Sequence, residues 1–101
     1  MATVSAPVVF RAAARIEFDE AGDWYETRRA GLGASFAAAI QAVLDQIAAQ
    51  PELYPVVEGD IREAAVRGYP YCVYYRAEPG RVVVLAVFHT SRDPAVWRAR
   101  A

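Results

Sequence analysis

The hydrophobic period of this chain changes once, and the change separates a helical part from a strand-like part. Between Ala12 and Pro51, apolar residues recur every three or four positions, as they do on one side of an amphipathic helix. Beyond Asp60, apolar residues form short continuous runs between turn residues, as they do in buried strands. A chain that places consecutive helices before consecutive strands favours an α+β fold with separate layers.

The helical part is expected to form an antiparallel helical hairpin. A first helix is predicted over Ala12–Arg29, with an acidic outer face. A Gly-Leu-Gly sequence at residues 31–33 interrupts the pattern, and a second helix follows and ends before Pro51. Because the interruption is short, the two helices should lie side by side. Trp24 and Tyr25 are expected in the core or in contacts within the hairpin.

The strand-like part is expected to form an antiparallel meander, because tight turns separate its runs. A brief apolar run at residues 7–10 precedes the helices, and Pro51–Asp60 is predicted to be an irregular surface connection. The predicted order is therefore β-α-α-β-β-β, with the helical hairpin packed on one face of a small, mainly antiparallel sheet. The three later strands are expected at Ile61–Arg67, Tyr71–Arg76 and Arg81–Phe88.

The tail is expected to add one helical turn. Residues 94–100 follow the last strand, and Trp97 lies where it can pack back onto the sheet.

Length and composition are those of a small protein without a cofactor. At 101 residues and 55% apolar content, the chain is expected to form a single domain over residues 1–101. No apolar run approaches the roughly 20 residues of a membrane span, and no signal peptide is indicated, so a cytoplasmic location is expected. With Cys72 and His89 as its single cysteine and histidine, the chain is expected to hold no metal and no other cofactor.

Charge is distributed unevenly along the chain. Residues 61–101 carry seven arginines and three acids, whereas residues 1–60 carry four arginines and nine acids. The C-terminal part is therefore expected to meet an anion. The chain has no lysine, which excludes Schiff-base and lysine general-base chemistry. Any catalysis would have to use arginine, histidine, tyrosine or a carboxylate.

Strict alternation along the strands predicts which side chains share a face. Arg62, Ala64 and Val66 are expected together on one face of their strand. In the next strand, Tyr71 and Tyr75 are expected opposite Tyr74. In the last strand, one face is expected to hold Val83, Leu85, Val87 and His89, and the other Val82, Val84, Ala86 and Phe88.

The element order and an ordered set of motifs resemble the RelE/ParE superfamily of toxins from bacterial type II toxin-antitoxin modules. The resemblance covers nearly the whole chain. Its parts are Trp24-Tyr25-Glu26, Gly31-Leu32-Gly33 with Phe36, Pro51 and Pro55, Ile61-Arg62, Tyr69-Pro70-Tyr71-Cys72-Val73-Tyr74-Tyr75, and His89-Thr90-Ser91-Arg92-Asp93-Pro94 with Trp97.

The resemblance implies a growth-arresting toxin that a cognate antitoxin neutralises in a hetero-oligomer. Members similar to ParE block DNA gyrase, whereas members similar to RelE cut messenger RNA in the ribosomal A site. The thin set of basic residues favours the ParE-like mode, because RNA affinity comes largely from neutralised phosphates. Two alternatives stay open: a ribosome-dependent mRNA endonuclease, and a non-toxic relic or binding module that retains the antitoxin contact alone. Whether the chain is an enzyme is left open.

The candidate site residues follow from these alternatives. In an endonuclease, His89 would transfer protons and Arg62 would stabilise the phosphorane. Arg62, Arg92 and Tyr75 are the residues expected to bind an anion or the target. Each has a structural alternative: His89 could order its turn through a backbone carbonyl or Asp93, Arg62 could pair with a nearby carboxylate, and Arg92 could form an ion pair at the sheet edge.

Overall fold

The computed structural model describes residues 6–101 and confirms the predicted α+β class. The described elements are β1 Val8–Phe10, α1 Ala12–Arg28, α2 Leu32–Ala49, β2 Val56–Glu58, β3 Ile61–Ala65, β4 Tyr71–Glu78, β5 Arg81–His89 and α3 Ala95–Arg98. The order is thus β-α-α-β-β-β-β, followed by the predicted C-terminal turn of helix.

One expectation about the connection after α2 is wrong. Residues 51–60 are not wholly irregular, because β2 forms within them and pairs antiparallel with β3. Gly59, at a φ of 55°, closes the turn of this β2–β3 hairpin. The three residues of β2, Val-Val-Glu, show no alternation of apolar and polar residues that sequence reasoning could detect, and all three are exposed.

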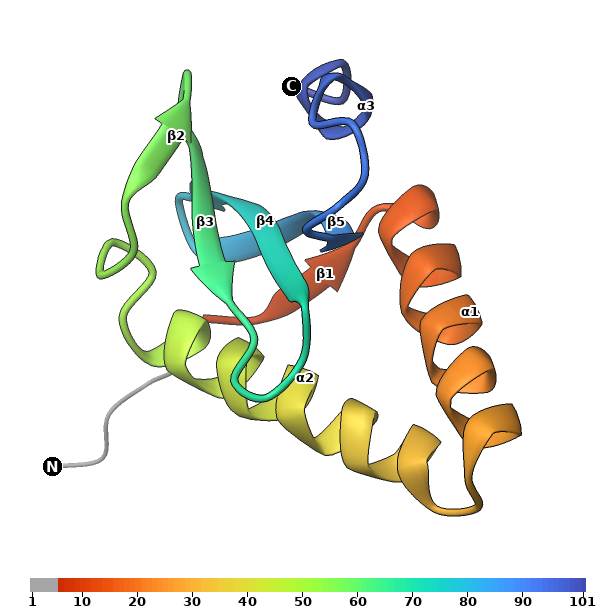
Figure 1. Cartoon of the computed structure of the whole chain (residues 1–101). Helices are drawn as coiled ribbons and strands as arrows, with labels where there is room; N and C mark the ends of the chain where they lie inside the picture. The colour runs from red at the N-terminus through yellow and green to blue at the C-terminus, as the bar shows by residue number, and fades with distance from the viewer. Residues whose placement is uncertain (1–5) are drawn as a thin grey trace, which may run out of the picture.

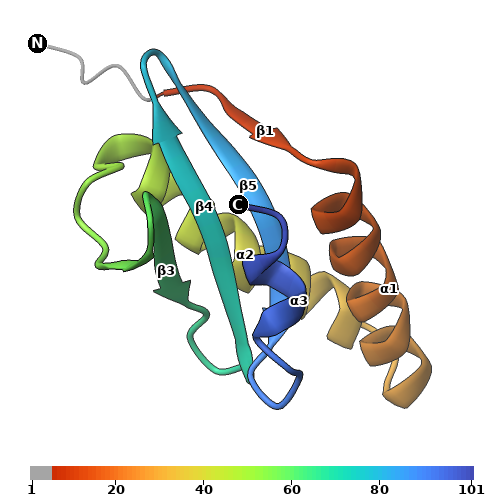
Figure 2. The ribbon, with the colours of Figure 1, turned by 90° about the horizontal axis from the view of Figure 1, so that it is seen from above.

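The five strands form one mixed sheet in the order β1-β5-β4-β3-β2 (Figure 1). β1 pairs parallel to β5, with Val8 opposite Val82, and the other neighbours are antiparallel. Figure 2 shows that β1 runs beside β5 at one end, after which the chain turns away into α1. Within residues 6–101, this early departure of β1 leaves the remainder of β5 without a neighbouring strand on that side.

The helical hairpin covers one face of the sheet. Six residues of α2 are buried at helical spacing: Phe36, Ile40, Val43, Leu44, Ile47 and Ala48. By length and composition alone, α2 is also long and apolar enough to cross a membrane, although the sequence analysis expected no membrane span. In the structure this apolar side packs in the core against the strands.

The two helices approach each other closely at Gly33. A Cβ atom at this position would lie 2.7 Å from the carbonyl oxygen of Gly22 in α1. The Glu26 carboxylate accepts hydrogen bonds from the Gly31 and Gly33 N–H groups, each at 3.0 Å, and so caps the start of α2. The short glycine-containing turn therefore serves the contact between the helices as well as the change of direction.

A β-bulge corrects the predicted faces of β5. Tyr74 pairs with Ala86 but Tyr75 pairs with Val84, so Leu85 is an extra residue between them. Leu85 and Ala86 consequently share the face away from the hairpin, together with Val83 and Phe88. Val82, Val84 and Val87 face the hairpin. The predicted grouping of Val83, Leu85 and Val87 is wrong because a single inserted residue reverses the alternation.

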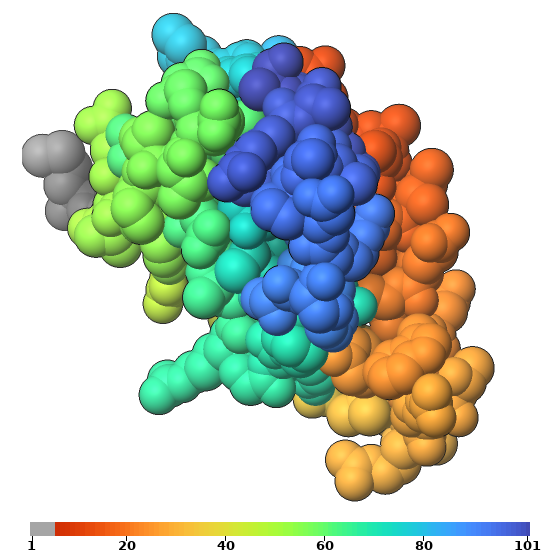
Figure 3. All heavy atoms as spheres, turned by 45° about the horizontal axis from the view of Figure 1, so that its top comes forward, coloured from red at the N-terminus to blue at the C-terminus, as the bar shows by residue number. Residues whose placement is uncertain are grey.

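The C-terminal segment covers part of the second face. Trp97 of α3 is 2% exposed and stacks on Tyr74, with ring centroids 4.0 Å apart. This confirms that Trp97 packs on the sheet. Figure 3 shows the C-terminal segment between the β2–β3 hairpin and α1, and Arg98 forms an ion pair with Glu58 of that hairpin at 3.5 Å.

The close approach of the helices yields a pair of substitutions with opposite effects. Gly33→Ala should lower the free energy of unfolding by about 1–2 kcal/mol, because the new methyl group overlaps a backbone oxygen. Gly22→Ala should raise it by about 0.5–1 kcal/mol, because alanine is the better helix former and its Cβ meets no atom within 4 Å. Urea denaturation followed by circular dichroism measures both, and equal effects would contradict the described contact.

Candidate functional site

A groove of about 440 Å³ lies between α1, the start of β4 and the end of β5, and we call it the α1–β5 groove. It brings together His89 and Arg92, two of the predicted site residues, at the point where β5 has passed the end of β1. Other side chains that line it include Glu17, Glu20, Trp24 and Tyr71.

The imidazole of His89 is engaged on one side. Its Nδ1 accepts a hydrogen bond from the Ser91 N–H at 3.0 Å and lies 2.8 Å from the Ser91 hydroxyl oxygen. The ring stands edge-on to Tyr71, with centroids 5.1 Å apart. Because Nδ1 accepts from a backbone donor, the neutral ring carries its proton on Nε2. A neutral His89 thus offers Nε2 as a hydrogen-bond donor, whereas a general base would need a free lone pair there.

Glu17 is the centre of charge in the groove. Its side chain is 11% exposed and accepts hydrogen bonds from Arg92 at 2.8 Å and from Arg100 at 2.8 and 3.0 Å. It also accepts from the Val87 N–H at 3.2 Å. The carboxylate therefore fastens the C-terminal segment to α1 and β5. Arg92 additionally lies over the Phe88 ring, 4.2 Å from its centroid.

Arg62 and Tyr75 lie elsewhere, where both hold the connection after α2. Arg62 donates to the Tyr54 carbonyl at 2.6 Å and to the Glu52 carbonyl at 3.1 Å. The Tyr75 side chain is fully buried, and its hydroxyl donates to the Pro51 carbonyl at 2.6 Å. In this structure both side chains make intramolecular contacts, and their expected binding roles remain predictions.

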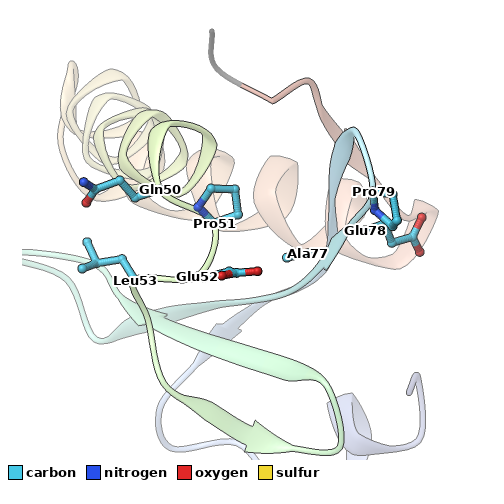
Figure 4. Close-up of a pocket in the computed structure, with 7 residues that line it drawn as sticks. All are labelled: Gln50, Pro51, Glu52, Leu53, Ala77, Glu78 and Pro79. Carbon is cyan, nitrogen blue, oxygen red and sulfur yellow. The ribbon is translucent and has the colours of Figure 1, made fainter. Parts of the chain in front are cut away.

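The connection held by Arg62 and Tyr75 forms one side of a second cleft, of about 660 Å³. Figure 4 shows residues 50–53 on one side of this cleft and residues 77–79, from the end of β4 and the turn that follows it, on the other. The cleft is lined by prolines and two carboxylates, and it contains none of the predicted site residues.

His89 and Arg62 are far apart in the sheet. His89 pairs with Tyr71 and Arg62 with Tyr75, so they are separated by four residues along β4, or about 13 Å. They also lie on strands either side of β4, about 10 Å apart across the sheet. While Arg62 keeps its bonds to the carbonyls, the two side chains do not meet at one phosphate, as acid–base catalysis on it would require.

Intramolecular ion pairs neutralise most of the C-terminal arginine excess. The sequence did not indicate this pairing. Of the seven arginines beyond Asp60, five form ion pairs with carboxylates and Arg62 donates to carbonyls. The five ion-paired residues are Arg76, Arg81, Arg92, Arg98 and Arg100. The sequence count therefore overstates the unpaired positive charge of this region, and anion binding stays a prediction.

Burial also affects two ionisable side chains of β4, Tyr71 and Cys72. Burial raises the pKa of Tyr71, and the neighbouring Tyr25 phenol raises it further. Burial likewise raises the pKa of the Cys72 thiol, so at neutral pH it is a poor nucleophile. Among residues 6–101, no group of three or more histidine, cysteine, aspartate or glutamate side chains is placed to hold a metal ion.

Sequence reasoning missed two residues of the groove, Glu17 and Trp24. Trp24 was expected in the core or in hairpin contacts, but it is 50% exposed at the groove. Its ring lies edge-on to Tyr25 and under the Arg28 guanidinium, 4.5 Å from the ring centroid. Its aromatic character gave a signal for burial, whereas Glu17 was one of several acids on a helix and had no distinguishing signal.

Comparison with known proteins gives a family and a fold. Residues 8–94 match the family model described as "ParE toxin of type II toxin-antitoxin system, parDE". A search of curated proteins finds no match. Among solved structures, a chain of "Chromosomal ParDE TA system from P. aeruginosa" is similar, with a TM-score of 0.62 and 13% sequence identity. The match covers 84% of this chain and 96% of that chain, and at this identity it shows the fold alone.

Removing the Glu17 carboxylate should destabilise the protein. Glu17→Ala leaves the Val87 N–H without its acceptor and two arginines without their carboxylate, so we expect a loss of about 1.5–3 kcal/mol in the free energy of unfolding. Asp19→Ala is the matched control, because its ion pair with Arg15 is exposed and should change stability by less than about 0.5 kcal/mol. Similar losses in both variants, measured by urea denaturation, would contradict the role of Glu17.

Proposed function

Since the chain belongs to the ParE family of toxins from type II toxin-antitoxin systems, we propose that it arrests growth by inhibiting DNA gyrase and that a cognate antitoxin neutralises it. The family match covers residues 8–94 and so includes all the strands and both long helices. Gyrase inhibition needs no nuclease chemistry in the toxin.

The observation that carries this proposal is the dispersal of the residues a nuclease would use. Transfer of an RNA phosphate to the neighbouring 2′-hydroxyl needs a base, an acid and positive charge at one place. His89 lies in the α1–β5 groove with Nδ1 occupied by Ser91, while Arg62 is bonded to carbonyls at the other end of the sheet. The internal pairing of five other arginines further reduces the affinity for RNA that unpaired charges would provide.

The proposed partner is a ParD-like antitoxin, and the complex is a hetero-oligomer in the cytoplasm. Antitoxin segments that fold on their toxin gain affinity from extended contact with grooves. The α1–β5 groove offers such a contact, with the exposed Trp24 at its rim and the partly buried Glu17 carboxylate behind it. No membrane takes part in the proposed function.

Pulse labelling of new DNA and new protein, after induction of this chain without its antitoxin, tests the target. We expect DNA synthesis to fall first and the His89→Ala variant to remain toxic, because the histidine supplies no chemistry to gyrase inhibition. Purified protein should also inhibit supercoiling by gyrase.

Two other outcomes would overturn the proposed target. Early loss of protein synthesis, together with loss of toxicity in His89→Ala, would identify an mRNA endonuclease. Normal growth despite expression of folded protein would identify a binding module that retains the antitoxin contact alone.

A further inference from the structure

The edge of β5 that faces α1 extends beyond β1, the strand beside it. β1 pairs with β5 at Val82–Val84, and the Arg11 N–H donates to the Val84 carbonyl at 2.9 Å before α1 begins. β5 continues to His89. From Leu85 onward its outer edge therefore has no neighbouring strand within residues 6–101.

Side chains take the place of a strand along the first part of this edge. The Val87 N–H donates to Glu17 at 3.2 Å, and the Leu85 carbonyl accepts from Arg100 at 3.1 Å. Exposed edge groups in a sheet pair readily with whatever reaches them. The ion pair between Glu17 and Arg100 thus covers the edge as far as the Val87 N–H and no further.

The next two backbone groups on the edge face the α1–β5 groove. The Thr90 N–H donates to the Pro70 carbonyl, so residues 70 and 90 form a hydrogen-bonded pair between β4 and the end of β5. Hydrogen-bonded and non-hydrogen-bonded pairs alternate along antiparallel strands. The backbone N–H and C=O groups of Val87 and His89 therefore point away from β4. The His89 carbonyl accepts from the Arg92 N–H. No hydrogen bond from residues 6–101 reaches the Val87 carbonyl or the His89 N–H on this side.

We infer that an extended segment of the cognate antitoxin binds in the α1–β5 groove as a short strand parallel to β5, an inference that rests on the proposed function. One residue of this segment donates its N–H to the Val87 carbonyl and accepts from the His89 N–H. An acceptor and a donor on either side of Phe88 form the pattern of a parallel bridge. The segment thus continues the direction of β1, which is itself parallel to β5.

The geometry favours an extended segment over a helix. A helix bonds its backbone groups internally, so it would bury the His89 N–H and the Val87 carbonyl without partners, which is unfavourable. An extended residue satisfies both groups at once. This matching of backbone groups selects the form of the occupant but carries no information on its sequence.

The side chains of the groove specify the chemistry of the segment. Ala21, Tyr25 and Val87 are among the lining residues and form an apolar floor for one apolar side chain. Glu17 and Arg92 pair with each other, and Glu20 has no ion pair among residues 6–101. We therefore assign the occupant as an extended segment with an apolar residue on the floor and a basic residue beside Glu20.

The direct test measures the hydrogen exchange of the His89 amide by NMR. The isotope-labelled chain is compared in its free state and in complex with the antitoxin encoded by the adjacent gene. Amide exchange at His89 should slow by at least about tenfold on binding, and a scalar coupling across a hydrogen bond should join the His89 nitrogen to an antitoxin carbonyl carbon. The Phe88 amide is the internal control, because it faces Cys72 of β4 in both states.

The charge of the segment is tested on the exposed side of α1. Glu20→Lys should weaken antitoxin binding about fivefold through loss of an exposed ion pair. Asp23→Lys makes the same charge change on the same helix but in a cleft that faces α2, so it should leave the affinity unchanged. Equal effects of the two variants would overturn the assigned basic residue.

The outcomes separate this inference from the proposed function. Antitoxin binding without slower exchange and without the coupling at His89 would overturn the strand addition and leave the proposed function standing. A wild-type chain that binds no antitoxin would overturn the proposed partner and this inference with it. Coupling of His89 to a second copy of the chain would overturn the antitoxin as occupant.

Discussion

Strand β5 extends beyond its parallel neighbour β1, and its outer backbone groups have to find other partners. One carboxylate, that of Glu17, meets much of this requirement by accepting from the Val87 N–H. The same carboxylate holds Arg92 and Arg100, so the C-terminal segment follows β5 back along the sheet. That path brings Trp97 onto Tyr74 and covers part of the second face. An ion pair that replaces a missing strand thus determines both the closure of the core and the position of the groove.

The order of elements could be predicted from the sequence because it depends on local patterns. The period of α2, the glycines before it and the apolar runs of β4 and β5 each predict their own element. The faces of β5 could not be predicted beyond Leu85, because one inserted residue reverses the alternation and leaves no mark in composition. Strand β2 was missed because three exposed residues carry no pattern.

The candidate site was predictable in part, for a related reason. His89 and Arg92 were identified from residue type and position at the end of a strand, and both lie in the α1–β5 groove. Their partners come from α1, which is distant in sequence, so nothing local marks Glu17 as the residue they share. Residue counts also overstate the free positive charge, since charge is neutralised by contacts that only the fold creates.

The pairing of the chain's early and late segments has a consequence for biosynthesis. β1 needs β5 as its partner, and Glu17 needs Arg100, which lies 83 residues later in the sequence. Contacts of such long range cannot form while the later residues are still being synthesised. A ribosome that has produced α1 and α2 therefore carries a nascent chain with an incomplete sheet and without the α1–β5 groove. The toxin therefore acquires its finished surface only after Arg100 has left the ribosome.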